Sequence, residues 1–167
     1  MPVYNGAQYL RESIESIQRQ TFTDWEFIIV NEFGSIDGSA EIVEMYAKGD
    51  KRIRLVQNDQ RLGLGESLNQ GIRLAEGEYI ARMDADDLSH PTRFAKQVLL
   101  MDDNPNVAVC GTYQHHFGPH MDWVHRPPVT AEQTRSNLLF NCDLCHSTLM
   151  LRKKTLLDHN LFYDNTC

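Results

Sequence analysis

The sequence contains no apolar run near the roughly 20 residues that a membrane-spanning helix requires, and no signal peptide opens it. These two absences favour a cytoplasmic protein and leave peripheral membrane association open. No basic cluster is present, and 16 lysines and arginines stand against 23 aspartates and glutamates, a formal net charge of -7. This balance argues against nucleic acid as a partner. With only four cysteines and no secretory signal, we expect free thiols rather than a disulfide framework.

The 167 residues, of which 41% are hydrophobic and 23% charged, are enough for one globular domain with a sizeable core. Through residue 113, predicted strands alternate with predicted helices across short loops. The predicted strands are 25–30, 53–56, 79–83 and 107–112, and the predicted helices begin at Gln8, Ser39, Glu66 and Ser89. This alternation indicates an α/β fold, a doubly wound and mostly parallel sheet with helices on both faces.

The pattern changes after Tyr113. Residues 114–129 contain three prolines and four histidines without a clear period, which favours an exposed hairpin or loop over a metal site. A helix capped by Thr130 is predicted through Phe140, and a further strand over residues 147–152. A second, differently built part of the molecule is therefore expected here.

Three carboxylates follow the predicted strand 79–83, namely Asp84, Asp86 and Asp87. Side chains alternate along an extended chain, so Asp84 and Asp86 should point to one side and Asp87 to the other, where it is free to cap the next helix. Two carboxylates at a strand end repel each other unless a cation lies between them. Hard oxygen ligands suit Mg²⁺ or Mn²⁺, which typically joins protein carboxylates to substrate phosphates. A solvated acidic turn is the alternative on this triplet alone.

Three loops should meet at one edge of the sheet, because each follows a predicted strand: residues 2–6, 31–37 and 84–87. Sheets of this class bind nucleotides in a crevice at the carboxyl ends of their strands. Tyr4 could stack on a base, and Asn31 or Glu32 could hydrogen-bond a base edge or a ribose hydroxyl. A loop-packing tyrosine and a helix-capping acid are equally compatible with the local sequence.

Four motifs occur in a fixed order, and together they resemble one family. They are Met1-Pro-Val-Tyr-Asn-Gly6, Ile29-Val30 with Gly34-Ser35-Ile36-Asp37-Gly38-Ser39, Asn58 with Leu62-Gly63-Leu64 and Ser67-Leu68-Asn69-Gln70-Gly71-Ile72, and Gly77 to Asp87. The sequence is similar to the family 2 inverting glycosyltransferases, which have the GT-A fold, a Rossmann-like fold of nucleotide-diphospho-sugar transferases. The similarity covers nearly the whole chain and is dense through Tyr113.

The resemblance implies a nucleoside-diphosphate-sugar donor, often a UDP-sugar, and a saccharide or lipid-linked acceptor of the kind used in polysaccharide biosynthesis. It implies that Pro2, Tyr4, an acid after Val30, and Asp84 shape the nucleoside pocket. It further implies that Asp86, together with Asp84, meets Mg²⁺ or Mn²⁺. On this basis residues 1–113 form the donor-binding half, and residues 114–167 begin an acceptor-binding half.

The segment after the second predicted strand departs from the family pattern. The family usually has Asp-Asp-Gly-Ser, whereas residues 31–35 read Asn-Glu-Phe-Gly-Ser, with one residue more and no aspartate pair. Asn31 can hydrogen-bond uracil as both donor and acceptor, and Glu32 keeps a carboxylate on a longer arm. The sequence leaves open which of them contacts the base.

The expected catalytic base is the second departure. Family members have an aspartate, usually in a Glu-Asp pair, shortly after a segment like residues 141–153 and a following Tyr-Asp, here Tyr163-Asp164. We expect that base after Cys167, and Asp164 is its nearest but disfavoured substitute. Residues 1–6 have the composition of a strand end and a turn, so we also expect a strand before them, in a chain that has been cropped.

Four rival interpretations are weaker. Residues 142–146 spell C-x-x-C-H, a haem attachment pattern, but no export signal supports it, and no second C-x-x-C supports zinc. A nucleotidyltransferase would normally carry a Gly-rich basic loop after its first strand, which residues 2–6 do not resemble. A binding module for nucleotide sugars, without chemistry of its own, is the rival from another functional class.

Overall fold

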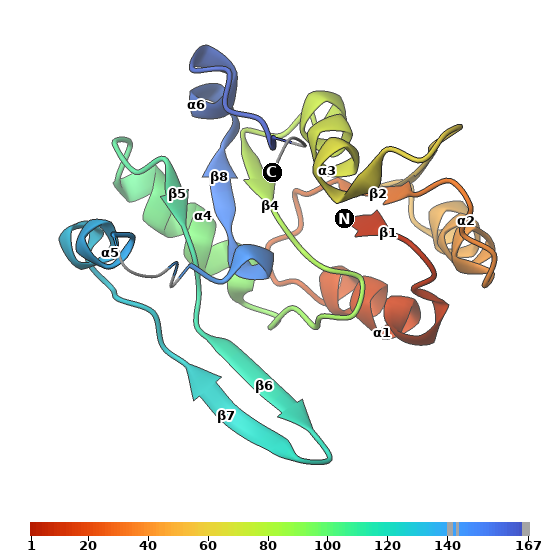
Figure 1. The fold of residues 1–167 in the computed structure, drawn as a ribbon, viewed down its shortest axis with the longest axis horizontal. Helices are drawn as coiled ribbons and strands as arrows, with labels where there is room; N and C mark the ends of the chain where they lie inside the picture. Colours follow the sequence, from red (N-terminus) through yellow and green to blue (C-terminus); the bar gives the residue numbers. More distant parts are fainter. Residues whose placement is uncertain (140–141, 143, 165–167) are drawn as a thin grey trace.

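The computed structural model describes residues 1–139, 142 and 144–164, and a parallel three-stranded sheet forms its centre (Figure 1). The strands β1 (Pro2–Val3), β2 (Phe27–Asn31) and β3 (Ile53–Gln57) lie in the order β1-β2-β3. β2 is buried along its whole length, as expected for an apolar strand covered on both faces. Because the three strands are parallel, their carboxyl ends emerge at one edge of the sheet.

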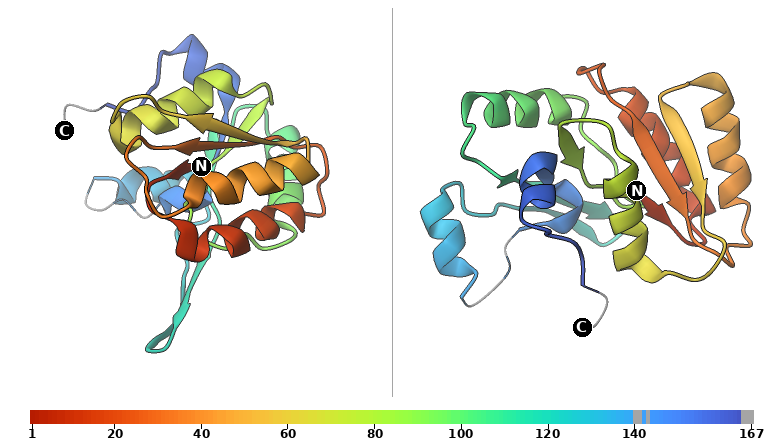
Figure 2. Two further views of the ribbon diagram at one scale, coloured as in Figure 1. Left: turned by 90° about the vertical axis from the view of Figure 1, so that its right-hand side faces the viewer. Right: turned by 90° about the horizontal axis from the view of Figure 1, so that it is seen from above.

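Helices cover both faces of this sheet (Figure 2). α1 (Ala7–Gln18) and α2 (Ser39–Gly49) lie on one face, and α3 (Gly63–Leu74) lies on the other. Each helix buries apolar side chains at helical spacing: Leu10, Ile14 and Ile17 on α1, Ile42 and Val43 on α2, and Leu68 and Ile72 on α3. The predicted α/β fold with helices on both faces is confirmed.

A second sheet, β4-β8-β5, completes the body. β4 (Tyr79–Ala81) and β5 (Val109–Cys110) flank β8 (Met150–Arg152), which is antiparallel to both. The predicted strand 79–83 is therefore shorter than expected, and its partner is an antiparallel strand from late in the chain. α4 (Arg93–Asp103) begins after Ser89, the predicted start, with Thr92 in the capping position, and its Phe94 and Met101 join the core.

The chain beyond Tyr113 forms a hairpin that projects from the body (Figures 1 and 2). β6 (Gln114–Gly118) pairs antiparallel with β7 (Met121–His125). α5 (Ala131–Asn137) follows with Thr130 as its cap, as predicted, and then η1 (His146–Thr148) and α6 (Lys153–Asp158). Phe140, the predicted end of the capped helix, lies outside the described residues. Within the described part of the chain, no helix is long and apolar enough to cross a bilayer.

Candidate functional site

The loops that leave β1 and β2 are tied together at the carboxyl edge of the sheet. The Asn5 amide donates to Ser35 Oγ at 3.0 Å, and the Ile36 amide donates to Asn5 Oδ1 at 3.0 Å. The Gly6 amide donates to Ser39 Oγ, also at 3.0 Å, at the start of α2. These reciprocal bonds hold the two loops as one surface.

The loop after β4 joins the same surface. A Cβ atom placed on Gly6 would lie 3.5 Å from Ala85 Cβ, which is van der Waals contact, so the two loops lie directly against each other; it would also lie 3.1 Å from Val3 Cγ1, a tight contact that favours glycine at this position. Ser13 Oγ on α1 also donates to the Asp84 carbonyl at 3.4 Å. The three loops predicted to gather at one edge do so.

Tyr4 lies on the solvent side of this edge, with 47% of its surface exposed. The Arg61 guanidinium carbon lies 5.0 Å from the centre of its ring, a cation–π contact with the loop before α3. Pro2, in contrast, is a half-buried strand residue opposite Val30. The aromatic ring is therefore accessible at the edge of the sheet, whereas Pro2 lies within the sheet.

Glu32 is buried and its carboxylate accepts five hydrogen bonds. Oε1 accepts three of them, from the Phe33 amide at 2.9 Å, the Leu62 amide at 3.1 Å and Asn58 Nδ2 at 3.3 Å. Oε2 accepts the other two, from the Gly63 amide at 2.7 Å and Ser67 Oγ at 3.2 Å. Burial by itself would raise the pKa of Glu32, but these bonds hold it below its ordinary value. Glu32 thus anchors the loop that carries Arg61.

Asn31 is almost fully buried at the end of β2, and its amide is only half used. Nδ2 donates to Gln57 Oε1 at 3.0 Å, whereas Oδ1 has no hydrogen-bond partner among the described residues. A buried, unpartnered carbonyl oxygen is costly unless another group donates to it. The sequence left open whether Asn31 or Glu32 contacts the base. Both oxygens of the Glu32 carboxylate are hydrogen-bonded within the protein, whereas the side-chain oxygen of Asn31 has no partner among the described residues.

The carboxylates after β4 lie on a turn. Asp84 is partly exposed and forms an ion pair with the buried Arg82, while Asp86 is exposed. Residues 84–87 form a turn in which the Asp87 amide donates back to the Asp84 carbonyl at 3.4 Å, so the alternation predicted for an extended chain does not apply to these carboxylates. Asp87 does not cap α4 either, since Thr92 occupies that position.

This turn fits a hard divalent cation. Within the described ranges, no group of three or more His, Cys, Asp or Glu side chains is placed to enclose a metal ion. Mg²⁺ and Mn²⁺ sites in nucleotide enzymes do not need one, because one or two carboxylates suffice when substrate phosphates and water supply the other oxygens. Asp86 and Asp84 match that donor set.

A family model described as Glycosyl transferase family 2 matches residues 1–161. The chain belongs to this family. Among its relatives, an uncharacterized glycosyltransferase of Haemophilus influenzae is 31% identical, over 96% of this chain and 53% of the relative. The putative glycosyltransferase EpsE of Bacillus subtilis is 37% identical, over 91% of this chain and 54% of EpsE. The chain therefore spans about half the length of the curated relatives it matches.

Solved structures place the family 2 chain in the GT-A fold. The crystal structure of S. aureus TarS 1-349 in complex with UDP-GlcNAc gives a TM-score of 0.79 at 22% identity, over 98% of this chain and 47% of that one. The mannosyltransferase PcManGT from Pyrobaculum calidifontis, in complex with GDP-Man and Mn²⁺, gives 0.72 at 21% identity, over 99% and 46%. At this level of identity the likeness establishes the fold.

Two residues of this family 2 domain that the sequence did not assign to the site, His146 and Tyr163, lie in the electrostatic field of Arg82 and Asp84. His146 Nε2 lies 2.7 Å from the Tyr163 hydroxyl. Burial lowers the pKa of His146, and nearby Arg82 adds to this effect. The Tyr163 backbone is held by Asn69, whose amide accepts from its N–H at 2.8 Å and donates to its carbonyl at 2.9 Å. The histidine that ends the C-x-x-C-H pattern thus contacts Tyr163, and Asp143 of that pattern lies outside the described residues.

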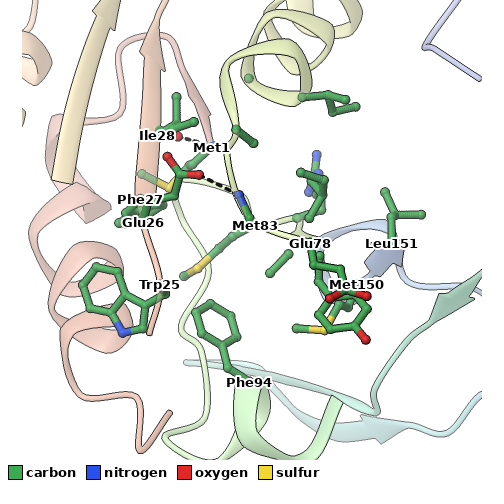
Figure 3. Close-up of a pocket in the computed structure, with 18 of the residues that line it drawn as sticks. Met1, Trp25, Glu26, Phe27, Ile28, Glu78, Met83, Phe94, Met150 and Leu151 are labelled. Atoms are coloured by element: carbon green, nitrogen blue, oxygen red, sulfur yellow. Dashed lines mark hydrogen bonds between the residues drawn. The ribbon is translucent and has the colours of Figure 1, made fainter. Parts of the chain in front are cut away.

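A cavity lies between β2 and β4, beside the carboxylate turn (Figure 3). It has a volume of about 670 Å³, with Phe27, Met83, Phe94 and Met150 among its lining, but Tyr4, Asn31, Glu32, Asp84 and Asp86 are not part of that lining. The Met1 amine enters it and donates to the Ile28 carbonyl at 2.8 Å, and burial lowers the pKa of this amine to about 5. The lining is mostly apolar but includes Arg82 and several acidic residues, and because the carboxylates of the turn are not among them, the cavity is a poor site for a nucleoside diphosphate and its metal ion.

Proposed function

We propose that this chain is the donor-binding part of a metal-dependent inverting glycosyltransferase that uses a nucleoside-diphosphate sugar, with UDP as the favoured nucleotide. The observation that carries the proposal is the turn bearing Asp84 and Asp86 at the edge where the loops of β1 and β2 also meet. Membership in glycosyl transferase family 2 supplies the reaction class. The ligands of TarS and PcManGT, UDP-GlcNAc and GDP-Man with Mn²⁺, are compatible with it.

The nucleoside is proposed to lie against Pro2, Tyr4, Asn31 and Asp84. Tyr4 offers an exposed ring for stacking, and the unpartnered Asn31 Oδ1 offers an acceptor for a base N–H. Uracil has one such N–H beside carbonyl oxygens, which suits an amide that can both donate and accept. Glu32 contributes indirectly in this proposal, because its five hydrogen bonds hold the loop of Arg61 against Tyr4.

The diphosphate is proposed to lie over the turn. A divalent ion held there by Asp86 and Asp84 would supply positive charge to the departing diphosphate. The acceptor hydroxyl attacks the anomeric carbon on the face opposite the diphosphate, so that one bond forms as the other breaks and the configuration inverts. In this proposal Asp84 and Asp86 contribute to the reaction by holding the diphosphate of the donor at the edge of the sheet.

The acceptor side is proposed to begin at residue 114 and to require the catalytic base expected after Cys167. A positioned base typically contributes about 10²–10⁴-fold to such a reaction. The acceptor is proposed to be a saccharide or a lipid-linked saccharide of a polysaccharide pathway, reached from the cytoplasmic side with or without peripheral membrane contact. A donor-binding module without transfer is the second candidate, favoured if the base is absent from the natural protein.

Calorimetric titration with UDP tests the proposal. We expect binding in Mn²⁺ or Mg²⁺ and a loss of most of that affinity in EDTA. Asp86→Ala should abolish most of the metal dependence, whereas Asp87→Asn, which changes the neighbouring carboxylate on the same turn, should retain it. Equal UDP affinity with and without EDTA would contradict the proposed site.

A further inference from the structure

Two arginines are buried beneath the carboxylate turn, which is unusual because a guanidinium loses its hydration on burial. Arg82 is 6% exposed and Arg93 is 8% exposed. They lie close together, because Arg93 Nη2 donates to the Arg82 carbonyl at 2.8 Å. Their interactions form a chain: Arg93 on α4 binds the backbone of Arg82, which follows β4, and the Arg82 side chain binds Asp84.

Arg93 is bound by neutral acceptors. Nη2 also approaches the Leu149 carbonyl at 3.3 Å, and Nε donates to Gln97 Oε1 at 3.0 Å. No carboxylate in the described part of the chain forms an ion pair with it. Burial lowers the pKa of Arg93 to about 10, a shift that the charge of Asp87 opposes, so the side chain stays cationic at neutral pH.

Gln97 extends the same connection. Its Nε2 donates to the Thr148 carbonyl at 2.9 Å and to the Cys110 carbonyl at 3.3 Å. Together, Arg93 and Gln97 reach the end of β4, the end of β5 and the segment that leads into β8. The first turns of α4 therefore fix the backbone from which the carboxylate turn departs.

Arg82, whose backbone is held by Arg93, in turn binds the side chain of Asp84. Its Nη1 forms the ion pair with Asp84 Oδ2, while its Nε is buried and has no hydrogen-bond partner among the described residues. An arginine with a purely structural role would be expected to use its buried donors within the protein. Arg82 instead directs the one ion pair that it forms among the described residues at a residue of the proposed donor site.

We propose that Arg82 and Arg93 are positioning residues for Asp84, with Arg93 holding the backbone of Arg82 and Arg82 holding the Asp84 carboxylate. The inference rests on the proposed function, since it assigns these arginines to the same donor site. It also gives the two carboxylates different surroundings: Arg82 orients Asp84 through the ion pair, whereas Asp86 is exposed, and both remain ligands of the proposed cation.

A double-mutant cycle tests the inference with UDP and Mn²⁺ as the probe. Arg82→Gln should weaken UDP binding about tenfold, the lower end of what partners of a ligating carboxylate contribute. Asp84→Asn should weaken it at least as much. The double variant should bind no more weakly than Asp84→Asn alone, because Arg82 acts through Asp84. Additive losses, or unchanged affinity in Arg82→Gln, would overturn the inference.

Arg93→Lys and a matched control separate positioning from stability. A lysine keeps the charge but cannot span the Arg82 and Leu149 carbonyls, so we expect weaker UDP binding in the folded protein. Arg152 on β8 also binds backbone carbonyls, those of Met101 at 2.8 Å and Val107 at 3.3 Å, away from the turn. Arg152→Gln should lower the melting temperature and leave UDP affinity unchanged. Equal affinity losses in the two variants would mean that Arg93 has only a structural role.

A measurement of thermal stability without nucleotide distinguishes failure of this inference from failure of the proposed function. The same cycle measured as thermal stability in the absence of ligand should be non-additive, since removing either partner breaks the one ion pair. If the unmodified chain does not bind UDP but the stability cycle is non-additive, the proposed function fails while the pairing stands. If the chain binds UDP and both cycles are additive, the inference fails while the proposed function stands.

Discussion

Replacing Glu32 by glutamine tests how the donor edge is held together. The change preserves the shape of the side chain and replaces one acceptor oxygen by an NH₂ group. If the glutamine places its oxygen at the Oε1 position, that oxygen still accepts from Phe33, Leu62 and Asn58. Its NH₂ group then replaces Oε2, which lies 2.7 Å from the Gly63 amide in the unmodified protein, so this amide would face a donor. One unpaired amide on the exposed Gly63, together with the loss of charge from the other bonds, should cost about 1–3 kcal/mol.

The assay is urea denaturation followed by tryptophan fluorescence, with Glu44→Gln as the control. Glu44 is exposed on α2, where such a change should stay within about 0.5 kcal/mol. Because the folded-state pKa of Glu32 is lowered, its contribution is fully present above the ordinary value of 4.5 and is lost as the pH falls through the folded-state pKa. The gap between the unmodified chain and Glu32→Gln should therefore narrow below pH 4.5. A Glu32→Gln variant as stable as Glu44→Gln at pH 7 would refute the anchoring role.

Two further predictions concern binding and turnover. Tyr4→Ala should weaken UDP binding about 5- to 30-fold if the ring stacks on the base, at roughly 1–2 kcal/mol, while Tyr4→Phe should bind like the unmodified chain. Calorimetry measures both, and equal affinity of the alanine variant would exclude stacking. With a panel of UDP-sugars, the 167 residues should release UDP very slowly or not at all, whereas a form extended at both ends should turn over. Equal turnover of the two forms would place the base within these residues.

The periodicity of the sequence was sufficient for the sheet and its helices, because β1, β2 and β3 are short apolar segments separated by amphipathic ones. The meeting of the three loops also followed from the sequence, since parallel strands end at a common edge. The alternation predicted for Asp84 and Asp86 does not apply, for a local reason. Alternation holds only while the chain is extended, and residues 84–87 form a turn.

Other features depend on residues far apart in the chain and could not be predicted. The donors around Glu32 come from residues 58–67, and no local pattern indicates that they surround it. β8 reaches β4 from late in the chain, so the antiparallel pairing at Ile80 and Leu151 was not visible in either segment. The sequence favoured an exposed hairpin or loop over residues 114–129, and the structure has the hairpin; only the bounds of β6 and β7 were not predicted, because both strands are largely exposed and lack the alternation by which strands are recognised.

A crystal structure of this chain with UDP and Mn²⁺ tests the central claim most directly. The account predicts the base against Tyr4 and Asn31, the diphosphate over the turn, and Mn²⁺ bound to Asp86, with Arg82 still paired to Asp84. Nucleotide in the mostly apolar cavity between β2 and β4, or Mn²⁺ bound away from Asp84 and Asp86, would contradict it.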